Sequence, residues 1–196
     1  MYTTPKFVFT SSLRYHSANS AKIFFHIKLI SVGAMVAKKF KKRYYNNLTL
    51  LWNDFRYPIQ NRDKMKLAMA GDLVSPAFRE RLMLAVTAVN GCRYCSYFHA
   101  KEALKTGLPE AEIRAMQDGI LENAPTEELP ALLYAQHWAE SNAQPDPDIR
   151  QKLIAAYGLQ LTEAIDAVLH IIRMGNLLGN TTDYWLYRLS FGRLGV

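Results

Sequence analysis

The segment SPAFRERLMLAVTAVNG (75–91) restricts the fold more than any other, because it carries signals for both ends of a helix. Ser75 can accept a hydrogen bond from the free backbone N–H groups of a first helical turn, and Pro76 fits the first helical position. Asn90-Gly91 favours the left-handed conformation that ends a helix. The apolar residues between these signals recur at helical spacing. We therefore expect a helix that stops abruptly before Gly91.

The chain after residue 44 repeats this pattern almost everywhere, and no segment alternates in polarity as a strand does. Gly107, Gly119 and Gly158 predict helix ends, and Pro58 is expected to limit the first helix. The expected helices cover residues 48–60, 76–90, 92–106, 109–119, 125–143, 149–158, 161–179 and 183–191. The expected fold class is all-α.

Length and charge indicate one domain with an extension. The chain has 196 residues, 49% of them hydrophobic, which is enough for a full core. Its net charge of +7 is uneven, because nine basic residues and no acidic one precede Asp54, whereas the remainder has 15 basic and 17 acidic residues. We expect residues 1–55 to form a basic N-terminal extension that packs on the body or on a neighbouring subunit. Residues 56–196 are expected to form the helical domain.

The basic segment KKFKKRYY (38–45) raises the question of a nucleic-acid or membrane partner. We expect no nucleic-acid binding, because the remainder has no second basic patch and no DNA-binding motif. We also expect no membrane insertion, because the apolar stretch 23–37 is interrupted by His26 and Lys28 and is too short and too polar. A chain with only two cysteines suits a reducing compartment, so the expected location is the cytoplasm.

Both cysteines lie in NGCRYCSYFHAKEAL, at the start of the next expected helix. Cys92 and Cys95 are three residues apart, and His99 follows four residues later, so the three side chains share one helix face. Free N–H groups and the helix dipole favour a thiolate at this position. A helix terminus and a neighbouring imidazole can lower a cysteine pKa from about 8.5 to about 7 or less. Two thiols at this spacing can close a disulfide, which predicts a redox dithiol.

Two other interpretations of these residues stay open, namely coincidence in a helix and a zinc site. A C-x-x-C pair with a histidine supplies three ligands, but a structural zinc site needs a fourth. The chain has no second cysteine pair, and His137 and His170 show no ligand spacing. The residues also leave open which cysteine attacks, although the helix dipole favours Cys92, which is nearer the helix start.

Together with the helix before it, the cysteine segment resembles the carboxymuconolactone decarboxylase superfamily in its alkylhydroperoxidase D-like (AhpD-like) branch. FRERLMLAVTAVNGCRYCSYFHAKEALKTGL has Glu80 twelve residues before Cys92, and His99 four residues after Cys95, as that branch does. The likeness extends more loosely over about residues 60–185. It implies an AhpD-like all-α helical bundle that assembles as a homo-oligomer, either a homotrimer or a homohexamer.

The resemblance also implies thiol-dependent peroxide defence. Cys95 would attack and pass through a sulfenic acid or a mixed disulfide, and Cys92 would donate a proton and then resolve that intermediate. His99 and Glu80 would relay protons. The substrate would be a hydroperoxide or the disulfide of a partner peroxiredoxin, with electrons from a lipoyl or thioredoxin-like donor. No bound metal or organic cofactor is implied.

Two departures from the branch affect this interpretation. Tyr94 stands where peroxide-reducing members often have a histidine, and a phenol with a pKa of about 10 is a poor proton shuttle at neutral pH. The proton relay must therefore depend on His99 and Glu80. The decarboxylase branch typically lacks the cysteine pair. The expected function is a thiol-dependent antioxidant oxidoreductase, and the alternatives are a carboxymuconolactone-type decarboxylase and a non-catalytic redox-sensing oligomer.

Overall fold

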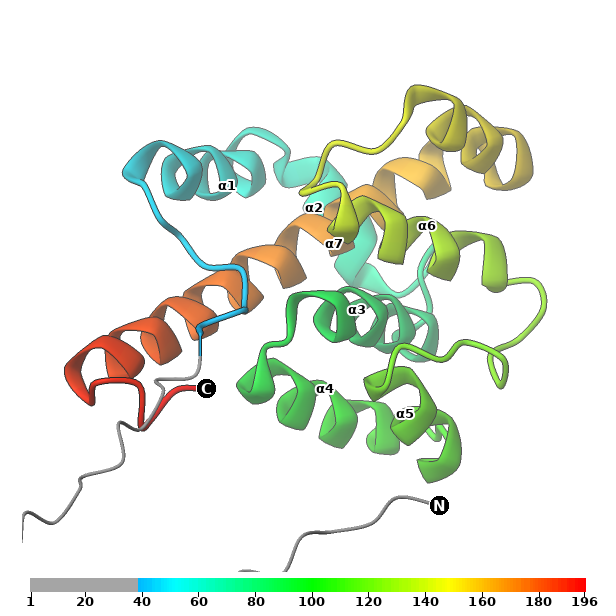
Figure 1. Cartoon of the computed structure of the whole chain (residues 1–196). Coiled ribbons are helices and arrows are strands. Elements are labelled where there is room, and N and C mark those ends of the chain that lie inside the picture. Colours follow the sequence, from blue (N-terminus) through cyan, green and yellow to red (C-terminus); the bar gives the residue numbers. More distant parts are fainter. Residues whose placement is uncertain (1–38) are drawn as a thin grey trace, which may run out of the picture. The chain divides into compact units, whose positions relative to one another are not determined.

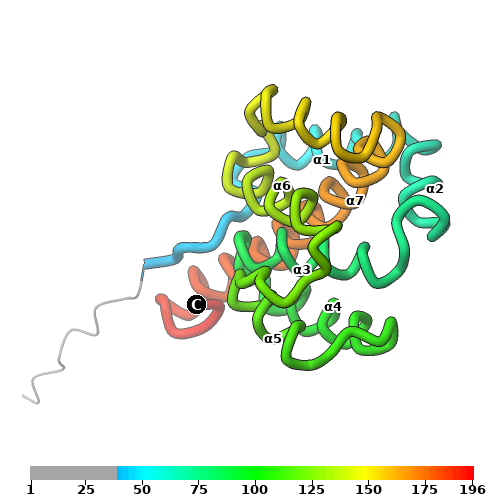
Figure 2. Tube along the Cα trace, turned by 90° about the vertical axis from the view of Figure 1, so that its right-hand side faces the viewer, coloured from blue at the N-terminus to red at the C-terminus, as the bar shows by residue number. Residues whose placement is uncertain are grey.

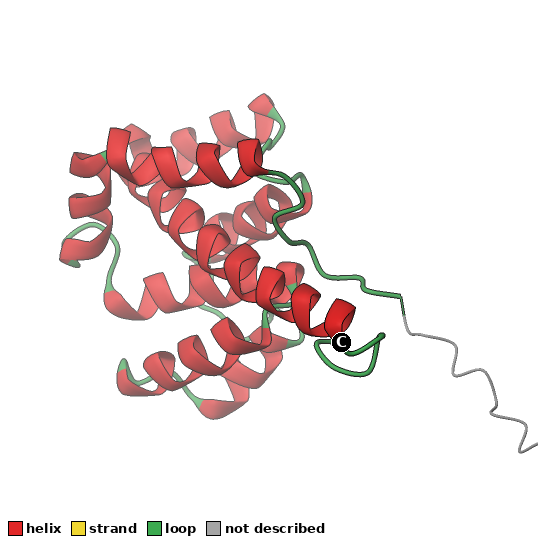
Figure 3. Cartoon of the chain, turned by 90° about the vertical axis from the view of Figure 1, so that its left-hand side faces the viewer, coloured by secondary structure: helices red, strands yellow, loops and turns green. Residues whose placement is uncertain are grey.

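The computed structural model describes residues 39–196, so the first 38 residues, including the apolar stretch 23–37, lie outside the described part. Residues 39–196 form seven helices and no strand (Figures 1 and 3), which confirms the expected all-α class. None of these helices combines the length and the hydrophobicity that a bilayer crossing needs. The helices are α1 (Leu48–Gln60), α2 (Arg62–Ala70), α3 (Pro76–Asn90), α4 (Arg93–Lys105), α5 (Glu110–Gln117), α6 (Leu129–Glu140) and α7 (Pro147–Leu189).

Helix α3 begins and ends at the predicted signals. The Ser75 hydroxyl accepts a hydrogen bond from the backbone N–H of Phe78 at 3.2 Å. Gly91 has φ +69°, a left-handed conformation that disfavours residues with a Cβ, and its N–H donates to the carbonyl of Thr87 at 2.8 Å. Because α3 stops so sharply, α4 starts almost at once, with Cys92 as its N-cap residue.

Helix α3 is also the most enclosed element of the described fold. It contacts α6 and α7 on one side and α4 and α5 on the other (Figure 2). Its apolar side chains pack with those of α6 and α7 into one core. The fully buried large residues of this core include Leu82, Leu84, Val86, Leu132, Ile165, Val168 and Leu169. This packing fixes the end of α3, and therefore the start of α4, against α7.

Helix α7 contacts α1, α2, α3, α4 and α6, and Figure 1 shows it in yellow through orange to red. Gly158, with φ 76° and ψ 164°, interrupts it and confirms the helix end predicted there. The prediction of a separate last helix over 183–191 is wrong, because α7 continues without a break from Leu159 to Leu189. The polar residues at 180–183 suggest a helix end, but their side chains form hydrogen bonds while the helix continues. The Thr181 hydroxyl donates to the carbonyl of Leu177 at 2.6 Å.

Helix α1 covers the residues expected for the first helix, and Pro58 lies in its last turn. Helix α2 has no counterpart among the expected helices. It is nine residues long and buries only Ala68, so it lacks the apolar stripe by which a helix is detected in a sequence.

The segment before α1 packs on the last turns of α7. The ring of Tyr44 stacks on that of Tyr184 with centroids 4.0 Å apart, and Lys42 Nζ lies 2.7 Å from the carboxylate of Asp183. The guanidinium of Arg43 donates to backbone carbonyls at the end of α6. The boundary predicted at residue 55 falls inside α1. Part of the basic charge before this boundary is therefore engaged within the described fold.

Candidate active site

The two thiols meet at the start of α4. Cys92 has extended backbone angles (φ −80°, ψ 103°), and its Sγ accepts a hydrogen bond from the backbone N–H of Cys95 at 3.3 Å. The two Sγ atoms lie 2.8 Å apart, and both thiols are free. A disulfide bond is about 2.05 Å long. A small movement of the sulfurs is therefore enough to bond them.

The surroundings place the first negative charge of the pair on Cys92. Its pKa is lowered to about 6, because the Cys95 thiol and the backbone N–H groups of Cys95 and Tyr94 donate to its sulfur, although burial opposes this effect. The pKa of the Cys95 thiol is raised, because its proton is held in the hydrogen bond to Cys92 and because burial disfavours a second charge. The direction agrees with the preference that the helix dipole gives to Cys92.

The cysteine with the lowered pKa is the less exposed of the two. Cys92 is only 1% exposed, whereas Cys95 is partly exposed. A cavity of about 200 Å³ lies against Cys92 and is lined in part by Ser96 and Gln117. The amide of Gln117 donates to the hydroxyl of Ser96 at 2.8 Å, so the cavity wall is polar.

His99 and Glu80 form a second pair, which joins α4 to α3. His99 Nδ1 and Glu80 Oε2 are 2.8 Å apart, and Glu80, from α3, is buried. Because a carboxylate accepts, it fixes the proton of the imidazole on Nδ1 and leaves Nε2 to exchange one. His99 lies one turn after Cys95 on α4, on the same helix face. The structure thus brings the four predicted residues together as two contacting pairs, one at the start of α4 and one between α4 and α3.

Helix α7 supplies a wall of the site that the sequence pattern did not predict. A Cβ atom at Gly179 would lie 2.8 Å from Sγ of Cys92, and one at Gly175 would lie 3.9 Å from Sγ of Cys95. The buried amide of Asn176 donates toward Cys95. The signal for this wall is two glycines one turn apart inside a helix, a spacing that puts both on one face and permits close approach.

A chain of buried amides joins the end of α3 to this wall. Asn90 Nδ2 donates to Asn176 Oδ1, and Asn176 Nδ2 donates to the hydroxyl of Thr87, both at 3.1 Å. Asn180 Nδ2 donates to the backbone carbonyl of Asn90 at 2.8 Å. Among the buried side-chain nitrogen and oxygen atoms of residues 39–196, Asn180 Oδ1 alone has no hydrogen-bond partner. The buried hydrogen bonds that the other amide atoms form fix the relative position of the elements that carry the thiols.

The zinc interpretation finds no support in the part of the chain that the structure describes. Among residues 39–196, no group of three or more His, Cys, Asp or Glu side chains is arranged to hold a metal ion. His170 stacks on Tyr57 with ring centroids 3.5 Å apart, and burial together with the charge of Arg173 lowers its pKa to about 4. His137 Nε2 lies 3.7 Å from a carboxylate oxygen of Asp146. Both histidines thus have other neighbours.

Comparison with known proteins bears on the same helices. The model of the carboxymuconolactone decarboxylase family matches residues 62–141, a segment that contains α2 to α6 and all four predicted site residues. Comparison with curated proteins and with solved structures gave no match. Over helices α2 to α6, the chain is therefore similar to the carboxymuconolactone decarboxylase family.

Proposed function

We propose that the chain is an AhpD-like member of this family, a thiol-dependent oxidoreductase whose Cys92 and Cys95 cycle between dithiol and disulfide as they reduce a hydroperoxide. The observation that carries the proposal is the 2.8 Å separation of two free sulfurs at the start of α4. The lowered pKa of Cys92 supplies a thiolate at neutral pH. The pair of His99 and Glu80 supplies a group that transfers protons.

The reaction has three steps. A thiolate attacks an oxygen of the hydroperoxide, the O–O bond breaks, and the cysteine becomes a sulfenic acid while the departing alkoxide takes a proton and leaves as the alcohol. The second thiol then attacks the sulfenic sulfur, a disulfide forms and water leaves. A dithiol donor of lipoyl or thioredoxin type reduces this disulfide by exchange. In total, the donor gives two electrons and two protons to the hydroperoxide.

Exposure supports Cys95 as the attacking cysteine in this scheme. A hydroperoxide must reach the attacking sulfur, and Cys95 is the more exposed of the two. The buried Cys92 holds the negative charge of the resting pair and takes the proton of Cys95 through their hydrogen bond. After the attack, Cys92 resolves the sulfenic acid. His99, oriented by Glu80, delivers the proton to the departing alkoxide.

The same exchange chemistry suits the disulfide of a partner peroxiredoxin as a second substrate. Either cycle needs a donor that is kept reduced, which fits the cytoplasm. The chain itself supplies both thiols and the proton relay, and the scheme calls for no metal or organic cofactor.

We also propose that the chain assembles with copies of itself, as a homotrimer or homohexamer. Helix α1 carries Leu48, Trp52, Phe55 and Ile59 at helical spacing, and these side chains are 49% to 82% exposed. Within residues 39–196, α1 has no buried residue. An apolar stripe of this kind on an isolated chain is typical of an interface between subunits.

The test is hydroperoxide consumption with a dithiol donor, measured for the wild type, Cys95→Ser and Cys92→Ser. We expect turnover by the wild type and its loss in both variants. A wild-type pair that is oxidised without turnover contradicts the proposal and supports a redox-sensing oligomer. Decarboxylation of a muconolactone-type acid that survives loss of both thiols contradicts it too, and supports the decarboxylase alternative.

A further inference from the structure

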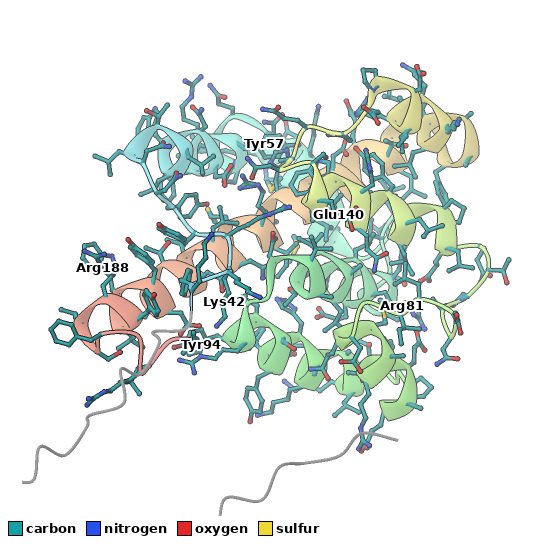
Figure 4. All side chains as sticks on the ribbon, viewed as in Figure 1. Lys42, Tyr57, Arg81, Tyr94, Glu140 and Arg188 are labelled. Atoms are coloured by element: carbon teal, nitrogen blue, oxygen red, sulfur yellow. The ribbon has the colours of Figure 1, made fainter. Side chains whose placement is uncertain are left out.

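The two residues between the cysteines bind one buried carboxylate of α7. Oδ1 of Asp183 accepts hydrogen bonds from Arg93 Nη2 at 2.7 Å and from the Tyr94 hydroxyl at 2.9 Å. Oδ2 accepts from Lys42 Nζ at 2.7 Å. Figure 4 shows Lys42 and Tyr94 near one another, between the start of α4 and the last turns of α7. Every residue of the Cys-x-x-Cys turn therefore contacts α7 or the other cysteine.

The buried carboxylate of Asp183 depends on these hydrogen bonds more than its donors do. The side chain of Asp183 is fully buried, whereas that of Arg93 is 50% exposed and Tyr94 is 43% exposed. A buried charge without partners is costly, while half-exposed donors can bond to water instead. Burial alone would raise the pKa of Asp183, but the hydrogen bonds from Lys42 and Tyr94 and the charges of Lys42 and Arg93 lower it. Asp183 is thus a fixed anion at neutral pH.

The donors also hold each other. Arg93 Nη2 donates to the Tyr94 hydroxyl at 2.9 Å, and the guanidinium carbon lies 4.8 Å from the centroid of the Tyr94 ring. Both side chains are therefore fixed at two points, on each other and on Asp183. Because both residues lie between Cys92 and Cys95 in the chain, these contacts fix the backbone of the turn as well.

We propose that Asp183 is a positioning residue for the cysteine pair, which holds the turn through Arg93 and Tyr94 and thereby sets the reduction potential of the pair. The proposal rests on the redox dithiol of the proposed function but on no particular substrate. It gives Tyr94 a role other than the proton transfer for which a phenol is unsuited.

Two effects of Asp183 act in the same direction on the potential. A rigid turn keeps the two sulfurs together, which raises the effective concentration of one thiol at the other and favours the disulfide. The negative charge of Asp183 also disfavours the Cys92 thiolate, because like charges repel. A less stable thiolate makes the reduced form less stable. Both effects make the disulfide harder to reduce.

The test is a redox titration of Asp183→Asn against glutathione. Each disulfide formed transfers two electrons and two protons from the thiols to oxidised glutathione, which becomes two molecules of glutathione. We expect the equilibrium constant for disulfide formation to fall about tenfold, which is a shift of about 30 mV to a more positive potential. We also follow the pKa of Cys92 by the ultraviolet absorbance of the thiolate, because the lost charge and the loosened turn act on this pKa in opposite directions.

The direction of the Cys92 pKa separates positioning from a simple effect of charge. A turn loosened by the loss of Asp183 weakens the hydrogen bond from Cys95 and moves this pKa upward, toward about 8.5 for an ordinary cysteine. A downward shift would mean that Asp183 acts through its charge alone, which contradicts the positioning role. Glu163→Gln is the matched control, because it breaks an ion pair of α7 with Lys64, 2.9 Å long, away from the cysteines. This variant should keep the wild-type potential.

Tyr94→Phe tests the inference if Asp183→Asn does not fold. It removes one half-exposed donor and leaves the charge of Asp183 in place. We expect a smaller shift of the same sign, about threefold in the equilibrium constant, as suits one hydrogen bond. If the wild-type pair forms no reversible disulfide with glutathione, the proposed function fails. If the wild type titrates and both folded variants keep its potential, or Tyr94→Phe alone does so where Asp183→Asn is unfolded, the positioning role is overturned.

Discussion

Cys92 and Cys95 have the same side chain, but their surroundings shift the two thiol pKa values in opposite directions. Hydrogen bonds from Cys95 and from two backbone N–H groups lower the pKa of Cys92 to about 6, whereas an ordinary cysteine has a pKa of about 8.5. The folded state therefore favours the thiolate more than the unfolded chain does. It follows that the reduced protein gains stability as the pH rises from about 6 to about 8.5, and loses it as the pH falls through that range.

This titration gives a direct prediction for the reduced protein. The ultraviolet absorbance of the thiolate should appear with a midpoint at about pH 6. Cys95→Ala removes the strongest donor to the Cys92 sulfur, so its midpoint should rise toward about 8.5. Ser96→Ala is a suitable control, because the Ser96 hydroxyl bonds to Gln117 and not to a cysteine. A wild-type midpoint near that of an ordinary cysteine would contradict the hydrogen bond between the thiols.

At the scale of helices, the site depends on how closely the start of α4 approaches α7. Gly179 is the point of closest approach, because a Cβ there would lie 2.8 Å from Sγ of Cys92 and 3.4 Å from the ring of Tyr94. Real Cβ atoms do not come so near a sulfur, and neither neighbour is free to move. Cys92 caps α4, and Tyr94 is bonded to Asp183.

We therefore expect Gly179→Ala to destabilise the protein by about 1–3 kcal/mol through overpacking, measured by urea unfolding of the reduced form. Disulfide formation between Cys92 and Cys95 should be slower as well. Gly175→Ala is the matched control, because its Cβ would make an ordinary contact of 3.9 Å with Cys95. Alanine is the better helix former, so this variant should be as stable as the wild type or more stable. Equal stability of the two variants would mean that α4 does not approach α7 so closely.

The elements that the sequence predicts well are those with local signals. The cap at Ser75 and the left-handed Gly91 depend on neighbouring residues, and together they place Cys92 at a helix start. The contribution of α7 could not be predicted in this way. Gly179 and Asp183 lie about ninety residues from the cysteines in sequence, and nothing in the local pattern relates them to the thiols. Contacts between distant elements depend on the packing of the whole core, which local signals do not specify.

The same limit explains the error at the end of α7. Polar residues near Asn180 suggest a helix end in sequence, because such residues favour turns and caps. In the folded chain, the Asn180 amide donates to the backbone carbonyls of Asn90 and Arg43, each at 2.8 Å. These polar side chains serve contacts between elements, and the helix continues through them. The role of Tyr94 is hidden in the sequence for the same reason, because the acceptor of its hydroxyl lies on α7.

At the scale of the whole molecule, helix α1 raises the question of assembly. It packs on α2 and α7, yet within the described chain it buries none of its residues, and its exposed apolar stripe is Leu48, Trp52, Phe55 and Ile59. Helix α4, which carries the cysteines, also exposes two aromatic rings, those of Tyr97 and Phe98. A monomer would expose both surfaces to water. We therefore expect α1 to contribute to the interface between subunits.

Replacing Phe55 with lysine tests this expectation. Phe55 lies in the middle of the stripe and is 51% exposed, so the change should cost little in the isolated chain but should place an unpaired charge in an apolar interface. Sedimentation should show an oligomer for the wild type and smaller species for Phe55→Lys at the same concentration. Arg56→Glu, which changes an exposed neighbour outside the stripe, should leave the assembly intact. Because the thiols, His99 and Glu80 all come from one chain, we expect the dissociated variant to keep the thiolate midpoint of Cys92. A monomeric wild type, or a Phe55→Lys variant that assembles like it, would place any interface elsewhere than on α1.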